Sequence, residues 1–312
     1  MRRSKPASSL ICGDSLALLH GLAPERRDAF LERIDGAASR QGVKMCWPHL
    51  REGRLERGAT LAALRHFLAP NSQGASPGKA SVATLGAAMA QEKSAGLTVS
   101  AGLAVARRLG AAAFVTGGLG GIHLPLQPAS ALSDRDVSAD LHAIASAHLP
   151  LYCAGFKPFI DAPGSLAYLE SLGVPVVQIG PGTLPALYAN DYGAKPPLTC
   201  DSAQMAWAIW RAHKSLGTGS GAVICVSLPQ DRAIAPGVLL EATGRELETV
   251  AAASVTGQSV TPALVQALRR HLGPALDDAN EAALTQAALT AIDSVAHDKM
   301  SKTYTPYAQE NA

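Results

Sequence analysis

The feature that most constrains the fold is the alternation of amphipathic helices with short apolar strands. Each predicted helix is followed by one strand, and the pairs cover 100–109 with 112–116, 138–148 with 151–153, 166–172 with 174–178, and 203–215 with 222–226. A helix between two strands allows them to lie parallel in one sheet. Strands that are apolar throughout are typical of a sheet covered on both faces. The chain is therefore predicted to be α/β, with a mostly parallel central sheet and helices on both faces.

The remaining sequence fits one such domain. Further helices are predicted at 262–272 and 280–297, which makes the C-terminal region helical. Hydrophobic residues make up 47% of the chain and aromatic residues only 4%, so the core is expected to consist of Ala, Leu, Val and Ile. No shift in composition marks a domain boundary. We predict a single α/β domain over 1–312, with a loop at 70–81 and a tail after residue 302 that is loosely held.

Charge and cysteine content exclude several classes of protein. The net charge is +2 and no basic block follows Met1–Arg3, which argues against a nucleic-acid polymer as partner. The five cysteines are spread singly without C-x-x-C spacing, so neither a zinc site nor a disulfide framework is predicted. No secretory leader and no membrane-spanning segment are expected. These features together predict a cytoplasmic protein.

A lysine follows the end of the second predicted strand. The segment 151–157 reads Leu-Tyr-Cys-Ala-Gly-Phe-Lys, so Lys157 comes shortly after a buried strand. An ammonium is costly to bury, and a lysine at such a place favours the neutral amine, which is a nucleophile. Lys157 is thus a candidate for Schiff-base chemistry. The alternative is a surface lysine that opens the next helix.

Two further motifs suit a phosphorylated ligand. Thr116–His123 reads Thr-Gly-Gly-Leu-Gly-Gly-Ile-His, and its glycines could turn backbone N–H groups toward an anion or simply form a tight turn. It matches neither the dinucleotide fingerprint nor the P-loop. Downstream, Ser138 is placed to cap a helix and Asp140 lies in its first turn. Asp136 is either a ligand for a hard divalent cation or a charge near the helix start.

These motifs occur in the order seen in one known family. The glycine motif, then Asp136-Val-Ser-Ala-Asp-Leu, then Cys153-Ala-Gly-Phe-Lys157 with Asp161 resemble the pseudouridine-5'-phosphate glycosidase family. Thr261-Pro262 near the C-terminus matches as well. The resemblance covers roughly residues 10–296 and is strongest over 99–202.

The resemblance implies a role for individual residues. Lys157 would form an imine with C1 of ring-opened ribose 5-phosphate, Asp14 would stand for the glutamic acid that donates a proton, and Lys79 would be the second active-site lysine. Asp136 would bind Mn²⁺. The implied substrate-binding positions are Val99, Thr116, Gly117, Gly118, His123, Ser138, Ala139 and Asp140. The partners would be ribose 5-phosphate and a base aglycone, and the assembly a homotrimer.

The chain also departs from the family pattern. Asp14 is one methylene shorter than the family's Glu, and Val82–Gly86 stands where the family has Arg-Arg-Asp-Leu-Pro. The segment after His123 is longer and carries the apolar residues Leu126 and Leu132. The changes predict a C-glycosidase or C-nucleoside-forming C-glycosynthase on ribose 5-phosphate, whose substrate is either pseudouridine 5'-phosphate or a C-nucleoside with a different aglycone. Two alternatives stay open, namely a non-catalytic sugar-phosphate-binding relative or partner subunit, and a Schiff-base aldolase on an unrelated α/β fold.

Overall fold

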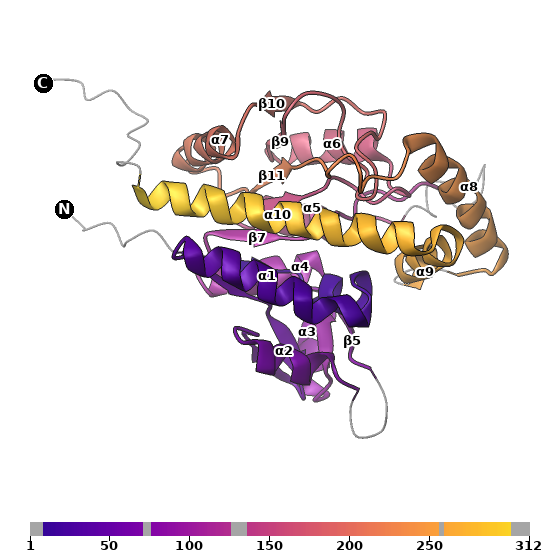
Figure 1. The fold of residues 1–312 in the computed structure, drawn as a ribbon, viewed down its shortest axis with the longest axis horizontal. Coiled ribbons are helices and arrows are strands. Elements are labelled where there is room, and N and C mark those ends of the chain that lie inside the picture. Colours follow the sequence, from indigo (N-terminus) through magenta and orange to yellow (C-terminus); the bar gives the residue numbers. More distant parts are fainter. Residues whose placement is uncertain (1–8, 71–75, 126–135, 256–258, 301–312) are drawn as a thin grey trace, which may run out of the picture.

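The computed structural model describes residues 9–70, 76–125, 136–255 and 259–300 (Figure 1). The predicted loop at 70–81 lies only partly within this range. The longer segment after His123 falls mostly outside it, and the tail after residue 302 falls outside it entirely.

A seven-stranded sheet forms the centre of the molecule. Its strand order is β10-β9-β11-β8-β7-β1-β2, and every neighbouring pair is parallel. The strands are β1 (Leu10–Gly13), β2 (Lys44–Cys46), β7 (Ala113–Val115), β8 (Pro150–Cys153), β9 (Val176–Ile179), β10 (Leu198–Cys200) and β11 (Ala222–Cys225). The predicted fold class is confirmed.

Helices cover both faces of this sheet because successive strand residues point to opposite sides. In β8, Leu151 and Cys153 face a core shared with α4, α5, α6, α8 and α9, while Tyr152 faces a core shared with α1, α7 and α10. Figure 1 shows α10, in yellow, running beside α1 across the second face. The α-helices are α1 (Arg27–Arg40), α2 (Leu61–Leu68), α3 (Leu85–Ala90), α4 (Val99–Arg108), α5 (Asp140–Ala145), α6 (Ala162–Ser171), α7 (Ala203–Ser215), α8 (Pro236–Ala252), α9 (Val260–Leu272) and α10 (Pro274–Met300).

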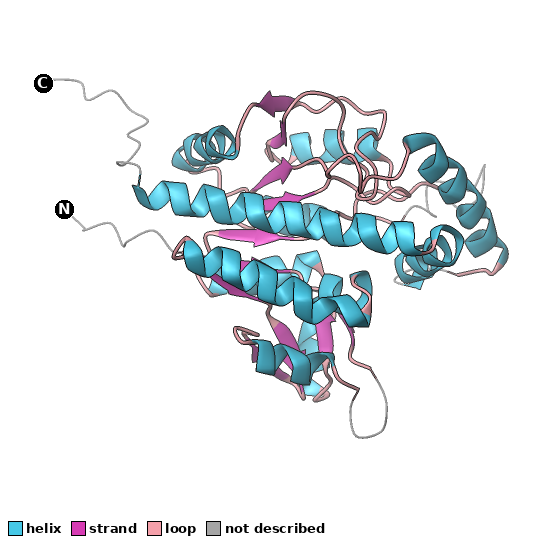
Figure 2. Ribbon diagram, viewed as in Figure 1, coloured by secondary structure: helices cyan, strands magenta, loops and turns pink. Residues whose placement is uncertain are grey.

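A second, smaller sheet was not predicted. It has the order β4-β3-β6-β5 and is mixed, with β3 (His49–Arg51), β4 (Arg54–Glu56), β5 (Gly78–Ala80) and β6 (Ala95–Leu97). Figure 2 shows it apart from the central sheet, with α2 and α3 beside it. The prediction of a loop over 70–81 is wrong at β5. A strand of three residues containing Gly has no local signal, and its pairing with the distant β6 decides its conformation.

Two short helical turns connect β1 to α1, namely the π-helical η1 (Ala17–Gly21) and the 3₁₀ turn η2 (Pro24–Arg26). None of the helices in the described ranges is long and apolar enough to cross a membrane.

Candidate active site

The predicted catalytic groups meet at the carboxyl edge of the central sheet. Asp14 follows β1, Thr116 follows β7, and Ala154–Lys157 follows β8. Since β1, β7 and β8 are neighbours, these three segments lie side by side at one edge. This edge is where ligands bind in parallel α/β sheets.

Asp14 is an acid held in a buried, hydrogen-bonded position. It is 6% exposed, its Oδ2 accepts a 2.8 Å bond from Thr116 Oγ1, and its Oδ1 accepts a 3.0 Å bond from the Ala17 amide. Burial raises the pKa of Asp14 to about 6, although these bonds and the positive charge of Lys157 oppose the rise. An acid with that pKa can carry a proton near neutral pH. The bond to Ala17 also caps the following helical turn, so Asp14 has a structural role as well.

Lys157 begins a tight turn and does not begin a helix. Its backbone N–H donates to the Leu119 carbonyl, and its own carbonyl accepts from the Ile160 amide at 3.1 Å, with Pro158 inside the turn. The next helix, α6, begins only at Ala162. The alternative of a surface lysine that opens the next helix is therefore wrong on the helix. Lys157 is also half-buried and not fully exposed. Its backbone is held by the glycine motif.

Lys79 reaches the same site from the small sheet. Burial lowers the pKa of Lys79, and the positive charge of Lys157 lowers it further, while Asp140, Asp136 and Asp14 oppose the change. The two lysines and three carboxylates thus act on one another electrostatically. The sequence resemblance selected Lys79, but only the pairing of β5 with β6 explains its position.

Protein side chains fill the space beside the glycine motif. A Cβ on Gly118 would lie 2.9 Å from Leu187 Cβ, and one on Gly120 would lie 2.5 Å from Ser138 Oγ. The requirement for glycine is therefore explained by packing, as in the tight-turn alternative. Within the described residues, however, the buried amides of Gly117 and Gly118 donate to no protein acceptor. Buried N–H groups are rarely left unpaired, so these two remain candidates for binding an anion.

Asp140 connects the glycine motif to α4. It is 5% exposed, and its two oxygens accept bonds from the Ser100 amide at 3.1 Å and from the Gly120 amide at 3.2 Å. Ser138 Oγ accepts from the Asp140 amide at 3.2 Å, but the N-cap residue of α5 is Ala139, so the prediction of Ser138 as the N-cap is wrong by one residue. Ala139 directly precedes this helix, and Val99 is the buried first residue of α4.

Replacement of Gly120 by Ala is expected to destabilise the fold. The added Cβ would meet Ser138 Oγ at 2.5 Å and Asp140 Oδ2 at 2.9 Å, so the contacts between the motif, α4 and α5 must shift. We expect a loss of about 1–3 kcal/mol in the free energy of unfolding, measured by denaturant titration. The matched control is Gly86→Ala in α3, where a Cβ meets nothing within 4 Å. There we expect a small gain, and equal effects of both changes would contradict the packing role.

His123 and Asp136 lie together at the margin of the site. His123 Nε2 is 3.2 Å from Thr261 Oγ1 and 3.9 Å from Asp136 Oδ2, and the ring packs against Phe159. Burial lowers the pKa of His123. Thr261 comes from α9, which explains why the Thr-Pro sequence far along the chain belongs with the other motifs.

The side chains near Asp136 fit a divalent cation whose other ligands are mainly water molecules. The Asp136 side chain is 39% exposed, and the described residues contain no group of three His, Cys, Asp or Glu that could hold a metal. A hard divalent cation can be bound through one carboxylate, with waters and substrate phosphate as its other ligands. Mn²⁺ at Asp136 stays a prediction.

Tyr192 is a residue that the sequence did not single out. Its hydroxyl contacts three carbonyls of the Lys157 turn, donating to Ile160 O and lying 3.2 Å from Pro158 O and 3.4 Å from Lys157 O. Tyr192 comes from the segment after β9. Its position could not be predicted because nothing in the local sequence shows which turn it contacts.

Replacement of Tyr192 by Phe is expected to slow the reaction at Lys157. The carbonyl of Ile160 loses its donor and the turn loosens, and a small displacement of a nucleophile has a large effect on rate. We expect a fall of about tenfold in kcat with little change in KM. The control is Tyr168→Phe, which removes the surface bond to His142 Nε2. If Tyr192→Phe lowered only the melting temperature, Tyr192 would be structural and would not position Lys157.

The fold and the site together define a class of protein. A parallel α/β sheet that presents a buried acid with a raised pKa beside two lysines is typical of an enzyme that acts on a small, anionic substrate.

Comparisons with known proteins agree with this class. Residues 3–297 match the family described as Indigoidine synthase A like protein. A pseudouridine-5'-phosphate glycosidase from Herpetosiphon aurantiacus is 32% identical over 259 residues, which are 83% of this chain and 82% of that protein. The chain therefore belongs to the pseudouridine-5'-phosphate glycosidase family and is an enzyme. The alternative of a lysine enzyme on an unrelated α/β fold is wrong.

Two crystal structures share the fold. An indigoidine synthase A-like protein from Thermotoga maritima superposes with a TM-score of 0.81 at 22% identity, covering 95% of both chains. The prealnumycin C-glycosynthase AlnA, solved in complex with ribulose 5-phosphate, superposes with a TM-score of 0.79 at 22% identity, covering 93% of this chain and 92% of that one.

Proposed function

We propose that this enzyme forms or breaks the carbon–carbon glycosidic bond between ribose 5-phosphate and a base, through an imine on Lys157. The observation that carries the proposal is the meeting of Asp14, Lys79 and Lys157 at the carboxyl edge of the sheet, within each other's electrostatic reach. Family membership supports the substrate class, because its curated members are named for pseudouridine 5'-phosphate. The ligand in the AlnA structure is also a pentose phosphate.

The chemistry needs both an acid and an amine. A carbon–carbon glycosidic bond has no leaving heteroatom to protonate, so the two-carboxylate mechanism of ordinary glycosidases does not apply. Protonated Asp14 gives its proton to the ring oxygen as the sugar opens, and the Lys157 amine bonds to C1. The bonded nitrogen gives up one proton, and its lone pair then forms C=N as the bond to the base breaks. The electron pair of that bond moves to the base carbon, which takes a proton. Water then hydrolyses the imine, which releases ribose 5-phosphate and returns the Lys157 amine.

Other residues hold the sugar phosphate. The amides of Gly117 and Gly118, which donate to no acceptor among the described residues, and the ammonium of Lys79 suit a phosphate or the hydroxyls beside it. When a divalent cation is bound, Asp136 would hold it, and the cation would neutralise phosphate charge. His123, fixed by Thr261 and Phe159, faces the same group of charges.

The aglycone proposed here differs from uracil. The replacement of the family's Glu by Asp14 and the apolar residues after His123 support a C-glycosynthase that joins ribose 5-phosphate to another heterocycle or aromatic ring. A homotrimer is proposed from the family resemblance, and a cytoplasmic location from the singly spread cysteines. If uracil and ribose 5-phosphate gave pseudouridine 5'-phosphate at the rate of a metabolic enzyme, the altered aglycone would be wrong.

Borohydride trapping tests the central step. The enzyme is incubated with ribose 5-phosphate and Mn²⁺, reduced, digested and analysed by peptide mass spectrometry. We expect a reduced five-carbon phosphate adduct on Lys157. A folded, metal-loaded protein that forms no adduct on any lysine would contradict the imine on Lys157 and favour the alternative of a sugar-phosphate-binding relative.

A further inference from the structure

Four of the five cysteines form two facing pairs in the central sheet. Cys12 of β1 is the register partner of Cys46 of β2, and Cys153 of β8 is the register partner of Cys225 of β11. All four are buried free thiols. Cys12 lies two residues before Asp14, and Cys153 lies four residues before Lys157. The strands that present the proposed acid and nucleophile therefore each carry a thiol that faces another thiol.

The pair Cys12–Cys46 has the geometry and charge of a reactive dithiol. Its Sγ atoms are 3.4 Å apart, closer than a relaxed sulfur–sulfur contact. The positive charge of Arg57 favours a thiolate at both positions. Hydrogen bonding between the thiols raises the pKa of Cys12 and lowers that of Cys46, so Cys46 is the more acidic thiol. A thiolate beside a partner thiol reacts with an oxidant that reaches it, and because both thiols are buried, that oxidant must be as small as hydrogen peroxide.

The pair Cys153–Cys225 provides a matched contrast within the same sheet. Its pairing is also between registered strands, and the bond to Cys153 and burial raise the pKa of Cys225, as the bond to Cys46 and burial raise that of Cys12. No basic side chain of the described residues opposes this rise. Both strands also lie inside the sheet, whereas β2 is an edge strand.

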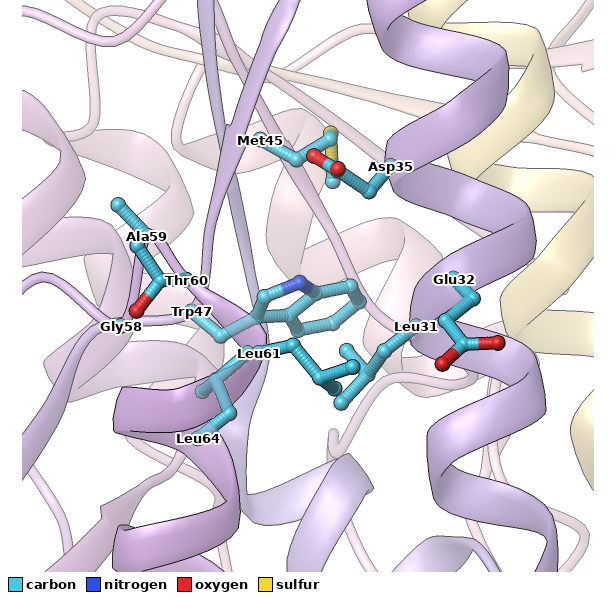
Figure 3. A pocket seen from close by; sticks show the side chains of 10 residues that line it. All are labelled: Leu31, Glu32, Asp35, Met45, Trp47, Gly58, Ala59, Thr60, Leu61 and Leu64. Carbon is cyan, nitrogen blue, oxygen red and sulfur yellow. The ribbon is translucent and has the colours of Figure 1, made fainter.

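The surroundings of β2 leave room for movement. The Sγ atoms must close from 3.4 Å to the length of a disulfide bond, about 2.05 Å, so the two side chains turn toward each other and β2 shifts against β1. Met45 and Trp47, on either side of Cys46, line a cavity of about 100 Å³ between α1 and the start of α2 (Figure 3). The cavity leaves the Trp47 side chain room to move when β2 shifts.

Movement of β2 reaches Asp14 through Trp47. A Cβ on Gly13 would lie 2.2 Å from the Trp47 ring, so the ring rests directly on the backbone of Gly13. Gly13 immediately precedes Asp14. A displaced Trp47 would remove this support and change the position of the carboxyl group.

We propose that Cys12 and Cys46 form a reversible disulfide that a hydroperoxide produces and that lowers the activity of the site. The Cys46 thiolate attacks the peroxide, whose O–O bond breaks to give Cys46 sulfenic acid and an alcohol or water. The Cys12 sulfur then attacks the Cys46 sulfur, an S–S bond forms, the S–O bond breaks, and the departing hydroxide takes the Cys12 proton as water. The two electrons that reduce the peroxide come from the two thiols. A strained disulfide of this kind is readily reduced again by thiols.

The experiment treats the folded enzyme with hydrogen peroxide, blocks free thiols, and maps crosslinked peptides by mass spectrometry under non-reducing conditions. We expect a Cys12–Cys46 crosslink and no Cys153–Cys225 crosslink. Adduct formation on Lys157 with ribose 5-phosphate should slow about tenfold and recover with dithiothreitol. Cys46→Ala should keep its activity in peroxide, and Cys225→Ala should respond like the unmodified enzyme.

Each other outcome overturns the proposal. Absence of the Cys12–Cys46 crosslink, or equal crosslinking of both pairs, contradicts the selective dithiol. A crosslink that leaves adduct formation unchanged contradicts its link to Asp14. The loss of activity rests on the proposed function, but crosslink mapping does not. An enzyme that forms the crosslink and never forms the Lys157 adduct, even when reduced, would refute the proposed function alone.

Discussion

Replacement of Lys157 by Ala is expected to abolish the borohydride-trapped adduct with ribose 5-phosphate and to lower kcat by about 10³-fold or more. The reason is that the nitrogen of Lys157 both forms the bond to C1 and supplies the lone pair that becomes C=N, whereas Lys79, the second amine of the site, is proposed to hold the sugar phosphate. The positive charge of Lys157 lowers the pKa of Lys79, so the two lysines lie near each other. Lys79 lies in β5 of the small sheet, whereas Lys157 follows β8 of the central sheet. Adduct mass and single-turnover rate, measured on the same preparation, check this prediction.

Two further variants, one at an exposed lysine and one at Lys79, serve as controls for the Lys157→Ala result. Lys195→Ala removes an exposed lysine after β9 and should leave both adduct and rate unchanged. Lys79→Ala should retain an adduct on Lys157 but form it more slowly, because a charge beside the substrate is lost. An adduct that persists in Lys157→Ala, on Lys79 or elsewhere, would show that the nucleophile has been wrongly assigned.

Replacement of Asp14 by Asn is expected to lower activity and to raise stability at neutral pH. The amide cannot donate an acidic proton, so kcat should fall by about 10²- to 10⁴-fold. Its size and hydrogen bonds remain suitable, since its carbonyl oxygen can accept from Ala17 and Thr116 Oγ1 can accept from its NH₂ group. The fold should therefore survive the change.

The gain in stability follows from the raised pKa. Burial raises the pKa of Asp14 to about 6, above the value of roughly 3.9 in an unfolded chain. The native state thus favours the neutral acid, and its stability falls as pH rises from about 4 to about 6. At pH 8, Asp14→Asn should gain up to about 3 kcal/mol, and at pH 4 almost nothing.

Denaturant titration at both pH values measures this difference, with Asp35→Asn on the exposed face of α1 as the control. If Asp14→Asn were less stable than the unmodified enzyme at pH 8, the bond from the Ala17 amide to the Asp14 carboxylate would stabilise the fold by more than the buried charge costs. Unchanged activity would remove Asp14 from the reaction altogether.

The central sheet and its sequence motifs could be predicted because their signals are local. Apolar strands such as Leu151–Cys153 and helices such as Ala203–Ser215 contain their own pattern, and the latter has the bounds that were predicted. The order of the glycine, aspartate and lysine motifs likewise identified the family without any knowledge of the fold.

The parts of the site that rest on distant pairing could not be predicted. Lys79 was expected in a loop and lies in β5, because pairing with β6 overrides a weak local preference. Asp140 was expected to bind substrate, which stays a prediction, and its bonds to the backbone amides of Ser100 and Gly120 could not be foreseen. Thr261 and Tyr192 act through contacts across long stretches of chain, which no local pattern encodes.

The sequence by itself thus determined the α/β class, the family and the chemically distinct residues Lys157, Asp14 and Asp136, since residue type and order carry that information. Only the tertiary structure decided which of them share one electrostatic environment. The raised pKa of Asp14 and the lowered pKa of Lys79 arise from burial, and burial depends on how β1, β5, β7 and β8 are brought together. The facing of Cys12 and Cys46 has the same origin, because it depends on strand register.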